Sequence, residues 1–509
     1  MISLTTHDFF SCLSLFFLGF SSCFFLGFFS FLFNFSFFIP QLNSRFYFVI
    51  KIYSFYLSLF ILLFAFFLEM NTPVDNFICF WGFFSTSYFQ RIVMLTVIAL
   101  SIFSLIGSYA YLQKNYFFSF EYFFLFILAV FSIAGLPYCF DFIGVYLFLE
   151  LQSLIFYTLA SFNRTSSFST EAGVKYFIIG AFSSGLLLFG ISLIYGACGS
   201  LNFEVLRVLL FDSNFYNNYH IILCFFGLFL IFCSFCFKIS AAPFHFWSPE
   251  VYEGSASSVS FFFAVVPKIS LLGTLLHFCS FAFFEFSFFW EVLFIIFAFF
   301  SFSFGSFSAV CQKKTKKFLA FSSVTHVGFI IAAASTHSFS GMTNVFFYLF
   351  IYSFLSISFW SFITFLNAQC FFNRSSFLAD FFLVNKQNFL LGGSLGLVLF
   401  SIAGIPPLSG FGAKFFSFIS VVENGSIFLS FIIVLFAVIS CFYYLRVVKW
   451  VFFDTSYANK GMLYQCKPFF SISFFESITF TSGLFFSCFL FIAPHFFILI
   501  SHRITLALF

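Results

Sequence analysis

The chain has 509 residues, of which 62% are hydrophobic and only 7% are charged. So few charges cannot cover that much apolar surface in water, so the composition excludes a soluble globular protein and indicates an integral membrane protein. The formal net charge of +4 is small, and the 111 phenylalanines exceed any folding requirement. We interpret the phenylalanine excess as a codon bias typical of an organellar genome.

Apolar runs of about 20 residues, long enough to cross a bilayer, follow one another along the whole chain. They predict an all-α polytopic membrane protein with fourteen transmembrane helices. The runs lie near 9–33, 46–68, 92–112, 118–138, 141–162, 173–197, 220–246, 257–281, 287–310, 318–336, 342–367, 389–421, 426–450 and 472–500. The polar stretches between them are short, so no extramembrane domain of any size is expected.

Basic residues are distributed unevenly over the connecting loops. Of the 21 Lys and Arg, fifteen lie in or beside loops that follow odd-numbered helices, three lie on the opposite side, and Lys238, Lys268 and Lys414 lie within spans. Loops on the inner side of a membrane carry the excess of Lys and Arg. This pattern therefore supports fourteen helices, with both termini on the opposite, outer side, which is the electrically positive side of the coupling membrane. The KKTKK run at 313–317 is therefore interpreted as a topology anchor and not as a nucleic-acid patch.

The sequence lacks the motifs of nucleotide, flavin and iron–sulfur chemistry. It contains no Walker loop, no GxGxxG after a strand, no HExxH and no paired CxxC. We therefore expect no cofactor and no metal on this chain. If the chain belongs to a redox enzyme complex, we expect other subunits to carry the electrons.

Two charged residues lie near the middle of predicted helices. Glu150 stands between Asp141 and Arg164, and Lys268 directly follows Pro267 in a long apolar run. At about 1.5 Å per residue, Glu150 is too deep to reach the surface. A lipid-exposed charge at this depth costs about 2.5–3.5 kcal/mol, so we interpret both residues as functional. A buried ion pair that only fixes helix packing is the alternative.

Lys238 and Lys414 neighbour helix-breaking residues. "FCFKISAAPFHFW" at 235–247 places Lys238 before Pro243, and "SIAGIPPLSGFGA" places Pro406 and Pro407 before Lys414. Irregular backbone at membrane depth marks ion pathways in transporters. Counting residues leaves Lys238 either a lysine at a helix end or a charge held inside the membrane beside a break. Lysine suits a proton relay because, unlike arginine, it can release its proton.

Three other residues leave two interpretations open. His326, which lies inside the predicted tenth helix beside three hydroxyl residues, suits a hydrated proton relay, with a packing role as the alternative. His245 follows the proline of the first break and is either a relay or a packing residue. Lys175, at the start of the sixth helix, either anchors the loop side or reaches inward.

Four stretches carry a resemblance to a known family. They are "KYFIIGAFSSGLLLFGISLIYG" at 175–196, "FKISAAPFHFWSPEVYEGSASSVSFFFAVVPKIS" at 237–270, "KKFLAFSSVTHVGFI" at 316–330 and "FSIAGIPPLSGFGAKF" at 400–415. Through them the chain resembles the subunit 2 family of mitochondrial NADH dehydrogenase, antiporter-like proton-pumping subunits of respiratory complex I. The first hundred and the last sixty residues match only in hydropathy.

The resemblance implies an antiporter-like fold of two inverted five-helix repeats, with broken seventh and twelfth helices. The implied divisions are an N-terminal three-helix segment at 1–115, a first repeat at 116–285, a second repeat at 286–455, and a C-terminal loop and helix at 456–509. The family's relay residues fall on Glu150, Lys238, Lys268, His326 and Lys414. The breaks fall at Pro243 and at Pro406 and Pro407.

The resemblance also implies a setting. NADH, FMN, iron–sulfur clusters and ubiquinone would belong to the whole complex. The expected partners are other membrane-arm subunits, especially those of the subunit 4 and subunit 4L types, and inner-membrane lipids with cardiolipin among the candidates. The expected location is the mitochondrial inner membrane, with both termini on the intermembrane-space side. The alternative function is that of a subunit of a cation/proton antiporter of the same fold.

Overall fold

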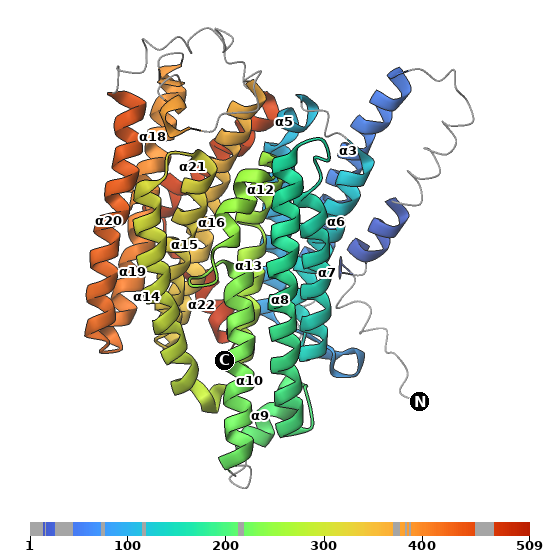
Figure 1. The fold of residues 1–509 in the computed structure, drawn as a ribbon, viewed down its shortest axis with the longest axis vertical. Helices are drawn as coiled ribbons and strands as arrows, with labels where there is room; N and C mark the ends of the chain where they lie inside the picture. The colour runs from blue at the N-terminus through green and yellow to red at the C-terminus, as the bar shows by residue number, and fades with distance from the viewer. Residues whose placement is uncertain are drawn as a thin grey trace.

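The computed structural model describes most of the chain as a bundle of roughly parallel and antiparallel helices (Figure 1). The described residues are 14–15, 17–25, 44–72, 77–114, 119–211, 218–369, 377–381, 384–385, 388–453 and 473–508. Most of the predicted first helix, 9–33, lies outside these residues.

The N-terminal part contributes helices and a small hairpin on one side of the bundle. Its elements are α3 (Ser44–Asn71), β1 (Phe77–Cys79), η1 (Phe80–Gly82), β2 (Phe84–Thr86), α4 (Tyr88–Gly107) and α5 (Tyr109–Lys114). The two strands pair antiparallel, with Phe77 opposite Thr86.

The helices that follow include the first break. They are α6 (Phe120–Gly135), η2 (Leu136–Tyr138), α7 (Phe142–Ala160), α8 (Ser167–Cys198), α9 (Phe203–Phe211), α10 (Asn218–Ile239), α11 (Trp247–Gly254), α12 (Ser257–Val265), α13 (Pro267–Phe281) and η4 (Phe284–Phe286). Helices α12 and α13 meet at Pro267 and together form one apolar segment from Ser257 to Phe281.

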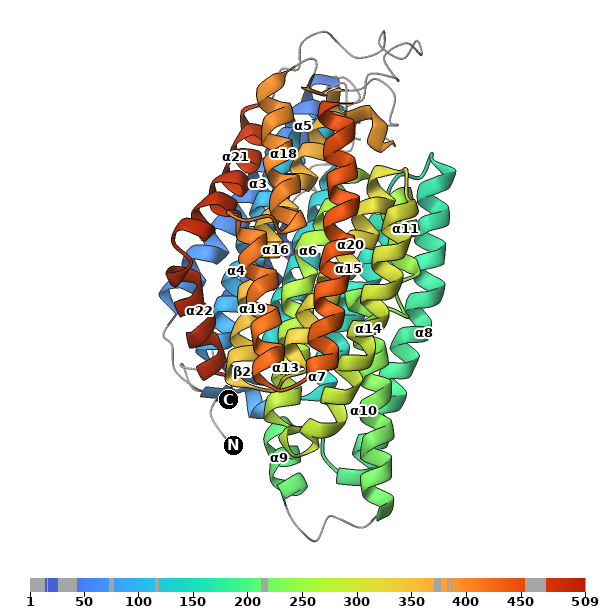
Figure 2. The same cartoon turned by 90° about the vertical axis from the view of Figure 1, so that its left-hand side faces the viewer.

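The remaining helices include the second break. They are α14 (Ser287–Cys311), α15 (Thr315–Ala334), α16 (Phe339–Gln369), η5 (Leu378–Phe381), α18 (Phe389–Ala403), α19 (Ser409–Glu423), α20 (Ile427–Phe452), α21 (Phe474–Ile492) and α22 (His495–Leu506). In Figure 2, α19 continues below α18, while α21 and α22 run along the opposite edge from α8.

Twelve helices of the described part are long and apolar enough to cross a membrane. Each corresponds to a predicted run, and α18 with α19 accounts for the predicted run at 389–421. The predicted total of fourteen stays a prediction, because the first run is described only in part. The division into inverted repeats likewise stays a prediction.

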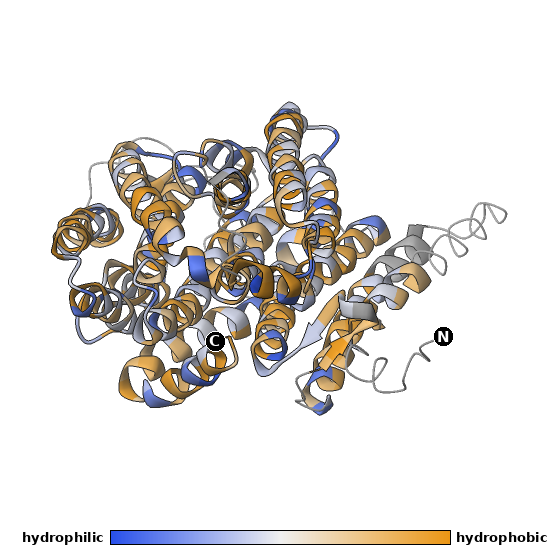
Figure 3. Ribbon diagram, turned by 90° about the horizontal axis from the view of Figure 1, so that it is seen from below, coloured by the Kyte–Doolittle hydropathy of each residue, from blue (hydrophilic) through white to orange (hydrophobic). Residues whose placement is uncertain are grey.

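The helices differ in how much of their surface faces other helices. The most hydrophobic window of Ser257–Phe281 is 100% buried and that of Phe339–Ala368 is 94% buried, whereas that of Ser167–Cys198 is 33% buried. Helices α12, α13 and α16 therefore form the inside of the bundle, and α8 lies at its edge. Figure 3 shows apolar residues dominating inner and outer helices alike, as expected for a protein whose solvent is lipid.

Both predicted breaks are present. Between α10 and α11 the chain turns at Ser240, which has a φ of +65°, and the Ala242–Pro243 peptide bond is cis. Between α18 and α19 it turns at Gly404, which has a φ of +86°, and the Pro406–Pro407 bond is cis. The sequence predicts that the seventh helix ends at 246. In the structure the helix resumes after the break as α11, which runs from Trp247 to Gly254. The polar residues of α11 hid this second half from hydropathy.

Candidate functional site

The first break brings two of the predicted lysines to one cavity. Lys238 comes from the last turn of α10 and Lys268 from the first turn of α13. Both line a cavity of about 10 Å³ that also includes Gln152, Ser153 and Ser240. The side-chain oxygens of Gln152 and Ser240 have no hydrogen-bonding partner among the described residues. This lysine cavity therefore offers water both room and polar partners.

Lys238 lies in the last turn of α10, directly before the first break. Helix α11 continues the chain after the break, and Lys238 is only partly exposed. The indole of Trp247 donates a 2.8 Å hydrogen bond to the carbonyl of Phe237, which satisfies one of the carbonyl groups that the break leaves free. Trp247 thus caps the end of α10, and the ammonium group of Lys238 is not needed for capping.

Glu150 lies near Lys238 without touching it. Its carboxylate accepts a 3.3 Å hydrogen bond from Ser153, one turn further along α7. Glu150 and Lys238 are close enough to attract each other electrostatically. Among the described residues no ion pair joins them, so the structure shows the predicted pair in a separated arrangement.

Tyr352 connects the lysine cavity with a second cavity. Lys268 is 3% exposed, and its ammonium group donates a 3.0 Å hydrogen bond to the hydroxyl of Tyr352 on α16. The ammonium also lies 4.9 Å from the centre of the same ring, within the range of a cation–π contact. Tyr352 in turn lines the next cavity.

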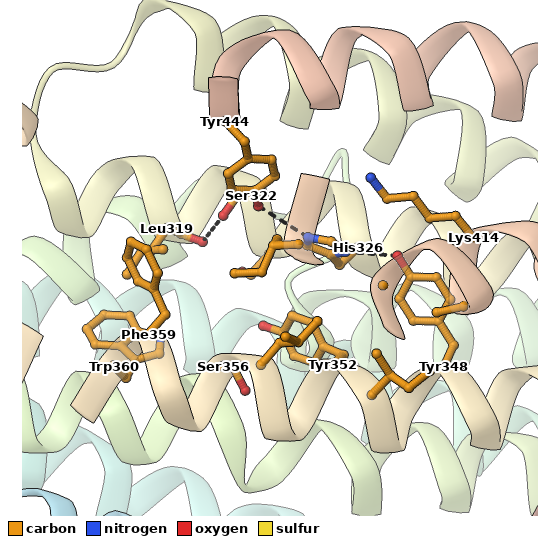
Figure 4. Close-up of a pocket in the computed structure, with 16 residues that line it drawn as sticks. Leu319, Ser322, His326, Tyr348, Tyr352, Ser356, Phe359, Trp360, Lys414 and Tyr444 are labelled. Atoms are coloured by element: carbon orange, nitrogen blue, oxygen red, sulfur yellow. Dashed lines mark hydrogen bonds between the residues drawn. The ribbon is translucent and has the colours of Figure 1, made fainter. Parts of the chain in front are cut away.

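His326 lies in this second cavity, which has a volume of about 40 Å³. Its Nδ1 is 2.8 Å from the hydroxyl of Tyr348 and its Nε2 is 3.2 Å from that of Tyr444. Figure 4 shows the imidazole held between the two hydroxyls. A neutral imidazole has one donor and one acceptor nitrogen, so one tyrosine accepts from the ring and the other donates to it.

Lys414 extends into the same cavity from α19. Its ammonium group donates to the carbonyl of Ala403 at 2.8 Å and to the hydroxyl of Ser440 at 2.9 Å. Ala403 is the last residue of α18, where free carbonyls and the helix dipole favour a cation. A Cβ on Gly404 would lie 3.0 Å from the Lys414 side chain, so glycine provides both the turn and the space.

Two of the predicted candidates occupy other positions. Lys175 has a half-exposed side chain and pairs with Glu171 at 2.7 Å and with Glu250 at 2.9 Å. It anchors α8 to α11 and does not reach inward. His245 is buried, and its ring lies 4.6 Å from that of Phe246. Its Nδ1 has no partner among the described residues, and it lines neither cavity.

Sequence reasoning missed the tyrosines and one acidic residue. Tyr348 and Tyr352 stand four residues apart in an apolar helix, a spacing that places both on one face and could have indicated them. Glu253, at the end of α11, accepts from Lys314 and at 2.8 Å from Lys317. Burial raises the pKa of Glu253, but the two ammonium groups outweigh it and hold that pKa below its usual value. The basic run at 313–317 thus also holds α11 in place through these ion pairs.

Two broken helices, each with a lysine beside the break that lines a cavity, are typical of membrane proteins of the antiporter-like class. The family described as "NADH:quinone oxidoreductase/Mrp antiporter, TM" matches residues 139–440. The chain is 37% identical over 445 residues to NADH-ubiquinone oxidoreductase chain 2 of Marchantia polymorpha, covering 86% of this chain and 85% of that protein. It is 40% identical over 314 residues to NADH-quinone oxidoreductase subunit N of Pelagibacter ubique, covering 62% and 65%.

Solved structures have the same fold. A chain of respiratory complex I from Thermus thermophilus superposes with a TM-score of 0.72 at 22% identity, over 94% of this chain and 97% of that one. A chain of the Mrp complex from Dietzia sp. DQ12-45-1b gives 0.78 at 16% identity, over 99% and 97%. The chain belongs to the NADH-ubiquinone oxidoreductase chain 2 family. Its relatives favour complex I over the antiporter alternative.

Proposed function

We propose that this chain is a proton-translocating subunit of the membrane arm of respiratory complex I. The observation that carries the proposal is the pair of cavities joined by Lys268 and Tyr352. Together they form a line of groups that can bind and release protons between the two breaks. Redox chemistry in other subunits would supply the energy.

The line of groups suggests an order of proton transfer. Glu150 and Lys238 form a pair whose separation sets how firmly the lysine holds its proton, because a nearby carboxylate stabilises the ammonium form. Lys268 passes protons laterally through Tyr352 to His326, and Lys414 completes the second half of the path. Moving one charge against the membrane potential costs about 2.3 kcal/mol per 100 mV. Breaking one buried hydrogen bond to a charged group changes the free energy by a similar amount, so it could drive this step.

The family suggests the surroundings of the chain. We place it in the mitochondrial inner membrane with both termini on the intermembrane-space side. Its neighbours would be membrane-arm subunits of the subunit 4 and subunit 4L types, with cardiolipin among its lipids. NADH, FMN, iron–sulfur clusters and ubiquinone would be bound by other subunits, with no redox site on this chain.

The test is a methionine substitution at Lys238 in the assembled complex. Methionine keeps most of the length of the side chain and removes the proton-binding nitrogen. The number of protons pumped per NADH oxidised, measured in closed vesicles, should fall in Lys238→Met. The exposed Lys449 gives the matched control Lys449→Met, which should pump as the wild type does. An unchanged ratio in a normally assembled Lys238→Met complex would contradict the proposal.

A further inference from the structure

A buried carboxylate in the last long helix takes no part in the line of groups described above. Glu476 lies in the first turn of α21 and is 1% exposed. One carboxylate oxygen, Oε2, accepts a 2.9 Å hydrogen bond from Ser473, and the backbone N–H of Glu476 donates to the same hydroxyl at 3.4 Å. The second bond is the N-cap bond of α21, and the first accounts for one oxygen of the carboxylate.

The capping role leaves the other oxygen unexplained. Oε1 of Glu476 is buried and has no hydrogen-bonding partner among the described residues. An unsatisfied buried polar atom costs about 1–3 kcal/mol, and more where the group is charged. Capping alone does not require a carboxylate, because the neutral side chain of glutamine could also accept from Ser473.

Glu476 lines a small cavity that has room for one water molecule. The cavity has a volume of about 10 Å³, close to what a single water needs. It is lined by Ser361, Phe362, Phe365, Leu391, Glu476 and Phe480. The hydroxyl of Ser361 donates to the carbonyl of Ser358 at 3.0 Å, so its oxygen remains able to accept a hydrogen bond. A water here would have two polar partners, Ser361 and Glu476.

Three helices hold this site together. Thr364 of α16 donates a 2.8 Å hydrogen bond to the carbonyl of Gly107 at the end of α4. A Cβ on Gly107 would lie 3.1 Å from the hydroxyl of Thr479 on α21 and 3.5 Å from the Cβ of Ser361. The close packing around Gly107 keeps Glu476 and Ser361 beside the same small space.

The site lies about one and a half turns of α16 from Ser356 of the histidine cavity. Ser356, Phe359 and Trp360 line the histidine cavity, and Ser361 lines the small one. At about 1.5 Å per residue, Ser356 and Ser361 are separated by about 7.5 Å along the helix. The predicted topology places the start of α21 and the end of α16 on the side of the basic loops, opposite the termini.

We propose that Glu476 is a proton-uptake site, through which protons from the side of the basic loops reach the histidine cavity. The inference rests on the proposed function. A proton from the aqueous side converts the carboxylate to the acid. The acid then gives it to the water beside Ser361 and becomes a carboxylate again, while the proton passes along α16 towards Tyr352 and His326.

The test compares Glu476→Gln with Lys414→Met in the assembled complex. Glutamine keeps the shape and the oxygen that accepts from Ser473, but it cannot carry a proton. The protons pumped per NADH should fall in Glu476→Gln by the same amount as in Lys414→Met. The exposed Glu285 gives the matched control Glu285→Gln, which should leave the ratio unchanged. Infrared difference spectra of the working complex should lose a carboxylic-acid band in Glu476→Gln.

The outcomes separate this inference from the proposed function. If Lys414→Met lowers the ratio and Glu476→Gln does not, uptake through Glu476 is wrong and the proposed function stands. If neither lowers it, the proposed function fails as well. Should Glu476→Gln not assemble, Ser361→Ala removes the second partner of the water without touching the carboxylate. A lower ratio in Ser361→Ala supports the inference, and an unchanged ratio overturns it.

Discussion

Removing the hydroxyl of Tyr352 should interrupt transfer between the lysine cavity and the histidine cavity. Tyr352→Phe keeps the ring, and with it the 4.9 Å cation–π contact, but it deletes the acceptor 3.0 Å from the Lys268 nitrogen. A hydrogen bond to a charged group contributes about 1.5–3 kcal/mol, and each 1.4 kcal/mol is about a factor of ten. The population of protonated Lys268 aligned for transfer should therefore fall by about tenfold to a hundredfold.

The assay measures NADH oxidation and proton pumping together in vesicles that contain the assembled complex. We expect Tyr352→Phe to assemble normally, because only one oxygen is removed, and to pump fewer protons per NADH. Tyr195 on α8 is exposed, so Tyr195→Phe is the matched control. Wild-type pumping and oxidation in Tyr352→Phe would refute the idea that protons cross between the cavities at this tyrosine.

Three further predictions follow from the breaks and the ion pairs. Gly404→Ala forces an L-residue into a φ of +86° and should destabilise the complex by about 1–2 kcal/mol, seen as a lower dissociation temperature. Glu253→Gln removes both lysine contacts and should cost about 1 kcal/mol at neutral pH. Because the folded-state pKa of Glu253 is lowered, its contribution is complete above the unfolded value near 4.5 and disappears as the pH falls through the folded value, so melting curves of variant and wild type should converge in acid. Lys175→Gln breaks only half-exposed pairs, so the melting temperature should show a stability change of less than about 0.5 kcal/mol.

The positions of the breaks and of the buried charges could be predicted from the sequence because their signals are local. Pro243 lies five residues after Lys238, and the length of the apolar runs places Glu150 and Lys268 near the middle of predicted helices. Counting residues leaves the depth of Lys238 open. The contact between Lys268 and Tyr352 could not be predicted in this way, since the two residues are 84 positions apart. Such a contact depends on how α13 and α16 pack, which hydropathy does not encode.

A repeated motif shows that backbone conformation, too, could not be predicted from the local sequence alone. "FSIAGLP" at 131–137 and "FSIAGIP" at 400–406 differ in one residue. Gly135 in the first copy is helical, with a φ of −73°, and a Cβ there would lie 2.3 Å from the ring of Phe148. Gly404 in the second copy has a φ of +86° and ends α18. Glycine provides space in one copy and a left-handed turn in the other, so the neighbours decide what the motif does.

The ion pairs of α11 determine where the broken segment could bend. Glu250 is held by Lys175 of α8, and Glu253 is held by two lysines of the 313–317 run. Both attachments lie on the half-helix beyond the break, and the chain between 240 and 246 is not helical. A helix fastened to two neighbours moves with them, so any change of angle must be absorbed at the unwound residues beside Lys238. The break would then act as a hinge, which turns a displacement of α8 or α15 into a displacement of the lysine.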